Sequence, residues 1–103
     1  METVRLDKFL WAARFYKTRA LAQQMIEKGR VRIDGARVKP ARALRPGVVL
    51  ELRQGSTRRR VEVLSLSDLR GPAAEAQRLY RDLTEPARLG LFDGMDDDED
   101  DDL

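Results

Sequence analysis

The residues at positions 17–19 combine two cations with a helix-capping hydroxyl group, in the order Lys17-Thr18-Arg19. Threonine is favoured immediately before a helix, and apolar residues at helical spacing follow it here. A cation at that end of a helix opposes the helix dipole and costs roughly 0.3–1 kcal/mol when exposed. Free backbone amides, a hydroxyl group and two cations at one helix start can together hold a phosphate group. We therefore predict an anion-binding site here; the alternative is that Thr18 only caps the helix and both cations are solvated.

Further basic residues follow at the end of this predicted helix. Lys28 lies near its last turn, and Arg30 and Arg32 alternate with the apolar Val31 and Ile33. Side chains two residues apart on a strand project from the same face, so Arg30 and Arg32 share one face. They either extend the anion site or form an ordinary solvated strand face. Their clustering with the other cations of the first 32 residues favours the first interpretation.

The charges of the chain are separated along its length. The 103 residues contain 20 Lys and Arg against 18 Asp and Glu, which gives a formal net charge of +2. Eight of the acids lie between Asp93 and Asp102, so residues 1–92 carry a formal charge of +10. Sixteen of the cations are arginine, which pairs bidentately with phosphate and stacks on bases. This surface predicts a nucleic-acid partner, with an acidic membrane surface as the weaker alternative.

Several function classes are disfavoured by what the sequence lacks. The chain has no Cys and no His, which removes thiol nucleophiles, imidazole acid-base chemistry and the usual zinc sites. No nucleophile elbow, glycine-rich phosphate loop or paired-carboxylate spacing occurs. We therefore expect neither an enzyme nor a bound cofactor or metal. The N-terminus shows no apolar segment behind a basic start, and no run approaches the roughly 18 apolar residues of a membrane span, so we expect a cytoplasmic protein with no membrane partner.

Two helices and a hairpin must position the basic residues. Leu6, Phe9, Leu10 and Ala13 have the spacing of one apolar helix face, which predicts a first helix over residues 6–14. A second helix is predicted between positions 18 and 29, where a glycine suits the left-handed residue that ends a helix. Its apolar residues at helical spacing are Leu21, Ala22, Met25 and Ile26. An Asp-Gly pair at positions 34 and 35 then predicts a tight hairpin.

The rest of the chain predicts a small antiparallel sheet and a third helix. Short apolar stretches between turn residues indicate four strands, at residues 31–33, around Val38, and at residues 48–52 and 60–64. Pro72 suits the first turn of a helix that would carry Ala73, Ala76, Leu79, Tyr80 and Leu83. The predicted fold class is α+β, with two N-terminal helices packed on a small antiparallel sheet and followed by a C-terminal helix. A chain of this length holds one compact core.

Two features leave alternatives open. Trp11 lies well off the apolar stripe of the first helix, so it either packs against the third helix or stacks on a base; core packing is the favoured interpretation for Phe15. The run Arg58-Arg59-Arg60 opens the last predicted strand. It is either a solvated edge that discourages strand pairing or a secondary nucleic-acid contact, and at least one of the three side chains must point away from the other two.

The C-terminal segment is acidic and of low complexity. We expect a binding domain at residues 4–66, a helical extension at 67–92 and a disordered acidic tail at 93–103. The tail is a solvated end without a role, a competitor for the basic face, or a weak binder of divalent cations.

The first third of the chain resembles a known family. Residues 18–35, TRALAQQMIEKGRVRIDG, resemble the alpha-L RNA-binding motif, also called the S-four domain. Residues 4–19, VRLDKFLWAARFYKTR, and the segment at 70–80 are similar to a ribosome-associated heat-shock branch of that family, so the resemblance covers about residues 4–85. In this family the quoted run forms the helix and hairpin that lie on structured RNA. The acidic run from Asp93 onward departs from the family pattern.

The resemblance implies a function on the ribosome. It implies binding to ribosomal RNA of the free large ribosomal subunit, and to peptidyl-tRNA held there, during rescue or recycling of stalled subunits in a stress response. We expect a monomer. The alternatives are a protein-interaction adaptor that uses the acidic tail, and a general binder of structured RNA or tRNA that is not specific to the ribosome. The predicted RNA-binding residues are Arg5, Lys8, Arg14, Lys17, Thr18, Arg19, Gln23, Lys28, Arg30 and Arg32.

Overall fold

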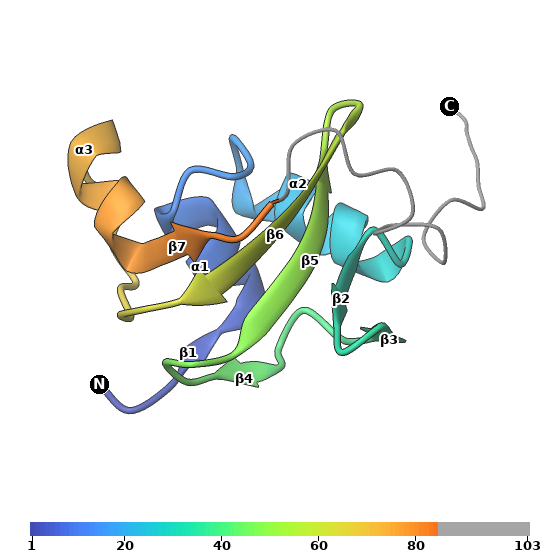
Figure 1. Cartoon of the computed structure of the whole chain (residues 1–103), viewed down its shortest axis with the longest axis horizontal. Helices are drawn as coiled ribbons and strands as arrows, with labels where there is room; N and C mark the ends of the chain where they lie inside the picture. The colour runs from blue at the N-terminus through green and yellow to red at the C-terminus, as the bar shows by residue number, and fades with distance from the viewer. Residues whose placement is uncertain (85–103) are drawn as a thin grey trace.

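Residues 1–84 are described by the computed structural model, in which a layer of helices packs on a twisted antiparallel sheet (Figure 1). The elements in chain order are β1 (Val4–Arg5), α1 (Leu6–Ala12), α2 (Arg19–Glu27), β2 (Val31–Ile33), β3 (Ala36–Arg37), β4 (Ala43–Leu44), β5 (Val49–Gln54), β6 (Thr57–Val63), α3 (Ala73–Ala76), the 3₁₀ turn η1 (Gln77–Leu79) and β7 (Tyr80–Asp82). The main sheet has the strand order β3-β2-β5-β6-β7, and β1 pairs separately with β4. The predicted α+β class is confirmed.

The hydrophobic core lies between the two long helices and one face of the main sheet, and α1 and α2 lie on the same side of β5 and β6 (Figure 1). Burial of apolar area, at roughly 25 cal/mol per Å², is the main force that holds these layers together. The core side chains from the helices and the three central strands include Leu6, Phe9, Leu10, Ala22, Ile26, Val31, Leu50, Leu52, Val61 and Val63. Within residues 1–84, none of the helices has the length and apolar character needed to cross a membrane.

The first helix confirms the predicted apolar stripe, because Leu6, Phe9, Leu10 and Ala13 are all buried. The helix ends at Ala12, two residues before the predicted end. Arg14 has a φ of 67°, and this left-handed conformation turns the chain out of the helix.

The second helix and the hairpin form for the predicted reasons. Thr18 Oγ1 accepts a hydrogen bond from the Leu21 amide at 3.0 Å, which confirms the N-cap, and Gly29 follows the helix with a φ of 76°. Leu21 itself faces solvent, in contrast to its predicted place on the apolar stripe. Asp34 and Gly35 have φ values of 53° and 77°, the pair of positive angles that a type I′ hairpin turn requires.

The third helix is much shorter than predicted. It ends at Ala76, and after η1 the chain becomes the strand β7, in which Tyr80 pairs with Val63 of β6. The prediction that the helix continues through Tyr80 to Leu83 is wrong. The unpaired backbone groups of β6 bond to this segment instead, and the Tyr80 ring lies 4.6 Å from the Phe15 ring. The main sheet therefore has five strands where the sequence indicated four.

The arginine run at 58–60 lies in an interior strand, because β6 pairs with both β5 and β7. The prediction of a solvated edge is therefore wrong, although the predicted alternation holds. Arg59 lies on the core side, where its guanidinium group is 5.1 Å from the Phe15 ring and 2.9 Å from an Asp82 oxygen. Arg58 and Arg60 lie opposite Arg53 and Glu51 in the register with β5, on the other face.

Candidate nucleic-acid interface

A buried carboxylate organises the surface where α1 meets α2. Asp7, in the first turn of α1, has a side chain with no exposed area. It accepts hydrogen bonds from Arg5 Nε and Nη2 at 3.1 Å each, and from Gln23 Nε2 of α2 at 2.7 Å. Arg19 Nη2 contributes a longer contact at 3.4 Å, and the backbone amide of Lys8 donates at 2.8 Å. We call Asp7 and the four residues that donate to it the Asp7 cluster.

The arginines of this cluster stay charged and partly exposed, so they can bind a further anion at the surface. Burial alone would raise the pKa of Asp7, but the hydrogen bonds from Arg5, Gln23 and the Lys8 amide outweigh it, so the pKa lies below its ordinary value. The carboxylate is therefore ionised at neutral pH. The side chain of Arg5 is 48% exposed and that of Arg19 is 38% exposed. Because a guanidinium group carries five N–H donors, both can bind a second anion while they hold Asp7.

The contact with Asp7 gives Arg19 a structural role that sequence reasoning missed. The prediction treated both cations beside Thr18 as unfavourable to the helix dipole. Attraction to the ionised Asp7 offsets that effect for Arg19, so the premise is wrong for this residue. Lys17 is exposed and has no partner within residues 1–84, so it alone of the two opposes the dipole without compensation. The dipole argument therefore applies to Lys17.

The starts of the two helices differ in what they can offer an anion. In α1 the amides of Leu6 and Asp7 donate to carbonyl groups of the loop before β4, at 2.9 and 3.1 Å. In α2 the hydroxyl of Thr18 occupies one amide, and those of Arg19 and Ala20 have no acceptor within residues 1–84. The start of α2 is therefore the one with open donors, beside the Asp7 cluster.

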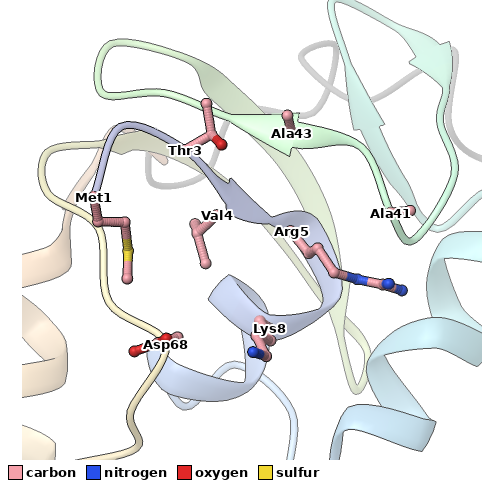
Figure 2. Close-up of a pocket in the computed structure, with 8 residues that line it drawn as sticks. All are labelled: Met1, Thr3, Val4, Arg5, Lys8, Ala41, Ala43 and Asp68. Atoms are coloured by element: carbon pink, nitrogen blue, oxygen red, sulfur yellow. The ribbon is translucent and has the colours of Figure 1, made fainter.

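A surface pocket of about 390 Å³ adjoins this cluster. Its lining residues come from the N-terminus, α1, the β4 region and the loop after β6, and they are Met1, Thr3, Val4, Arg5, Lys8, Ala41, Ala43 and Asp68. Figure 2 shows Arg5 extending away from Met1 and Asp68, in agreement with its contact to Asp7. Arg5 and Lys8 thus border one open hollow at the surface.

The structure divides the predicted binding residues into separate groups. Arg5, Lys8, Arg19 and Gln23 meet in the Asp7 cluster, next to the cap at 17–18. Arg14 lies in the connection between the helices, where its Nε donates to the Gly71 carbonyl at 2.8 Å and ties down the segment before α3.

Lys28, Arg30 and Arg32 lie at the other end of α2, a helix of nine residues that is about 13 Å long. Arg32 Nε donates to the Gly29 carbonyl at 2.9 Å, just beyond the helix. Arg37, which sequence reasoning missed, lies opposite Arg32 in the hairpin.

Arg37 binds the end of α2 directly. Its Nη2 donates to the Glu27 carbonyl at 3.3 Å, where the negative end of the helix dipole favours a cation. The sequence could have predicted the position of Arg37, because in a two-residue hairpin around 34–35 the residue at 37 lies opposite the residue at 32.

The aromatic residues behave differently from one another. Phe15 is buried, as predicted, and contacts the Tyr80 ring and the Arg59 guanidinium group. Trp11 is half-buried, and its carbonyl accepts a hydrogen bond from Arg70 Nε at 3.1 Å. Base stacking and packing on α3 both stay predictions for its indole ring.

Comparisons with known proteins agree with the resemblance seen in the sequence. The S4 domain family model matches residues 4–50. The chain is 52% identical over 82 residues to heat shock protein 15 of Escherichia coli K12, an alignment that covers 80% of this chain and 62% of that protein, so the chain spans less than two thirds of that relative. It is 37% identical over 82 residues to the RQC P-site tRNA stabilizing factor of Bacillus subtilis 168, and covers 94% of it.

A solved relative has the same fold. The trimeric structure of heat shock protein 15 from Vibrio cholerae matches with a TM-score of 0.76 and 51% identity, over 79% of this chain and 82% of that one. The chain is thus 37% identical to one relative that it covers to 94%, and 51% identical to a solved relative that it covers to 82%. The chain therefore belongs to the S4 domain family, among the relatives of heat shock protein 15.

Proposed function

We propose that this protein binds structured RNA through the Asp7 cluster and the start of α2, as a non-enzymatic component that acts on the ribosome. The observation that carries the proposal is the pair Arg5 and Arg19, which a buried carboxylate holds at the surface beside the two open amides of α2. Arginine held in a fixed orientation suits bidentate recognition of phosphate. Gln23 Nε2 and the Lys8 backbone amide donate to the same carboxylate, and Lys17 directly precedes the Thr18 cap.

The proposed target is ribosomal RNA of the free large subunit, with peptidyl-tRNA as a second contact, in rescue or recycling of stalled subunits. Two observations support this. One relative is named for stabilizing tRNA in the P site, and another is named as a heat shock protein. The basic residues at the two ends of α2, which is about 13 Å long, would then contact successive phosphates of one RNA backbone. In this proposal Lys28, Arg30 and Arg32 contact phosphates beyond the first.

The domain organisation follows the same division. Residues 4–66 would hold the RNA contacts and the described part of the predicted extension, residues 67–84, would support them, as the Arg14 to Gly71 bond illustrates. Residues 85–92 of that predicted extension lie outside the described residues. The predicted acidic tail at 93–103 lies outside the described residues.

Salt dependence of binding to purified ribosomal subunits tests the proposal. If about six phosphates are neutralised, log affinity should fall against log salt with a slope of roughly −4 to −5. Lys17→Gln should reduce that slope by about 1, because one phosphate contact is lost. The matched control is Lys39→Gln, an exposed lysine in the loop after β3, which should leave the slope unchanged.

The possible outcomes test RNA binding, the preference for the large subunit and the identity of the RNA target separately. A flat salt response would contradict RNA binding. Equal affinity for large and small subunits would remove the large-subunit assignment and leave RNA binding intact. Crosslinking in cells, followed by sequencing of the attached RNA, tests the target: recovery of messenger RNA in place of large-subunit RNA would favour a general RNA binder.

A further inference from the structure

The surface pocket beside the Asp7 cluster contains two opposite charges that do not bind one another. Lys8 and Asp68 both line this pocket of about 390 Å³, which we call the N-terminal pocket. Figure 2 shows their side chains around the same open space as those of Met1 and Val4. Within residues 1–84, neither the Lys8 ammonium group nor the Asp68 carboxylate has a hydrogen-bond or ion-pair partner. A donor and an acceptor are therefore both open to a ligand in one hollow.

The loop that carries the carboxylate is fixed on both sides of it. Ser67 Oγ accepts a hydrogen bond from the Leu69 amide at 3.1 Å, which closes a turn around Asp68. Arg70 Nε then donates to the Trp11 carbonyl of α1 at 3.1 Å. The ammonium group comes from α1 as well, so these bonds hold both walls of the N-terminal pocket. The pocket thus exists before a ligand binds, which lowers the entropy cost of binding.

The remaining walls of the N-terminal pocket suit a flat ring. Val4 is buried, and Ala41 and Ala43 contribute small apolar side chains from the β4 region. The exposed side chain of Met1 ends in a thioether, which packs favourably against aromatic rings. Sites for small molecules are mostly apolar, carry a few placed polar groups and measure roughly 300–1,000 Å³. The N-terminal pocket has these properties.

The pair of opposite charges favours a nucleobase over a phosphate group. A carboxylate repels phosphate, so the N-terminal pocket does not suit the RNA backbone. A neutral ring with donors and acceptors on one edge can use both charges. Guanine has two adjacent donors, N1–H and the N2 amine, beside the O6 acceptor, so a carboxylate can accept from both donors while an ammonium group donates to O6. Adenine, cytosine and uracil do not present two adjacent donors on that edge.

We propose that the N-terminal pocket binds the base of an unpaired guanine in the bound RNA, with Asp68 and Lys8 recognising its edge. This rests on the proposed function and adds a sequence preference to it. Proteins recognise RNA sequence mainly at loops and bulges, because the bases of an A-form helix are poorly accessible. Arg5, which borders the pocket and bonds to Asp7, would then contact a phosphate next to this guanine.

Binding of the full-length chain to a set of short RNA hairpins tests the pocket. Four hairpins share one stem and differ in a single bulged nucleotide, which is G, A, C or U. A fifth carries inosine, which lacks the N2 amine of guanine. The wild-type chain should bind the G hairpin at least about tenfold more tightly than the inosine hairpin, because one hydrogen bond to a charged group is lost. The A, C and U hairpins should bind at least as weakly as the inosine hairpin.

Removal of the carboxylate should abolish this preference. In Asp68→Ala the difference between the G and inosine hairpins should fall below about twofold, because no acceptor is left for the N2 amine. The matched control is Glu75→Ala, which removes the same charge from an exposed position in α3 and should keep the full preference. Loss of a negative charge raises the affinity of both variants for every hairpin, so the ratio of affinities is the measured quantity. Thermal unfolding should show both variants folded, since both side chains are exposed.

The other outcomes overturn the inference in distinguishable ways. Equal wild-type affinities for the five hairpins, or a guanine preference that survives Asp68→Ala, would overturn the pocket and leave the proposed function standing. A preference for another base that Asp68→Ala removes would overturn the assignment to guanine. Failure to bind any hairpin would overturn both proposals. Guanosine monophosphate that binds as tightly as the G hairpin would overturn the RNA source and assign the pocket to a free nucleotide.

Discussion

Arg5 and Arg19 share a buried carboxylate, whereas Arg53 and Arg60 point away from the core with no described partner. In the Asp7 cluster the cations are part of the packing of α1 on α2, so binding and stability depend on the same contacts. At Arg60, which lies opposite Glu51 on the other face of the main sheet, binding and stability are separable, because removal of an unpartnered, partly exposed charge costs the fold little. An ion pair with a buried acid therefore does not prevent an arginine from binding RNA. It holds the guanidinium group in a fixed orientation for binding.

Removal of the carboxylate should have the largest effect on stability. Asp7→Ala leaves the Arg5 and Arg19 guanidinium groups and the Gln23 amide without their shared acceptor. We expect the free energy of unfolding to fall by about 3 kcal/mol, near the low end for a broken buried pair because both arginines are partly solvated. Urea unfolding monitored by circular dichroism measures this change.

The control for Asp7→Ala is Asp34→Asn, at an exposed hairpin position whose φ of 53° asparagine tolerates well. It should change the free energy of unfolding by less than about 0.5 kcal/mol. Equal losses in the two variants would remove the special role of the Asp7 cluster. Asp7→Asn, which keeps the shape and one acceptor oxygen, should fall between them.

Strong acid should weaken the Asp7 cluster. The pKa of Asp7 is lowered in the folded protein, so the stabilisation it provides is present above the ordinary value of 3.8 and is lost as pH falls through the folded pKa. The pKa of Asp82 is lowered too: burial alone would raise it, but hydrogen bonds from Thr84 and Arg59 outweigh that effect. Unfolding midpoints measured between neutral pH and pH 2 should therefore decline at the acid end, less steeply in Asp7→Asn. An identical pH profile in that variant would contradict the ion pairing.

The smallest effect should separate the two cations that flank Thr18. Arg19→Ala should lower both RNA affinity and, by about 1 kcal/mol, the free energy of unfolding, because it removes one donor from the ionised Asp7. Lys17→Ala should lower RNA affinity alone, and relief of the dipole repulsion should leave stability unchanged or slightly higher. Paired RNA-binding and thermal-unfolding measurements on both variants make the comparison. Loss of stability in Lys17→Ala and not in Arg19→Ala would reverse the assignment.

Much of the fold follows from patterns within short stretches of sequence. The apolar stripe of α1, the Thr18 cap and the Asp-Gly hairpin are each determined by residues within one or two turns of the chain. The fate of Tyr80 could not be read this way. The residues around Tyr80 favour a helix. Tyr80 nevertheless lies in a strand, because it pairs with β6 and contacts the Phe15 ring, and both belong to distant parts of the chain.

The candidate site shows the same division. Arg5, Lys8, Arg19 and Gln23 were predicted from sequence, but the residue that brings them together was not. An acid in the first turn of a helix is also favoured by the helix dipole alone, so the sequence does not distinguish Asp7 from an ordinary helix-start acid.

By itself, the sequence determined which segments become the first two helices and the hairpin, and that the chain presents an arginine-rich surface. The helices and the hairpin depend on backbone sterics and on the periodic spacing of apolar side chains, which act within short stretches of chain. The basic character of the surface follows from the sum of the charges. Only the tertiary structure decided that Asp7 holds Arg19 and Gln23, 12 and 16 residues away, and that Arg59 turns inward while Arg60 faces out in an interior strand. Those outcomes depend on how the elements dock, because burial and strand pairing are properties of neighbours in space.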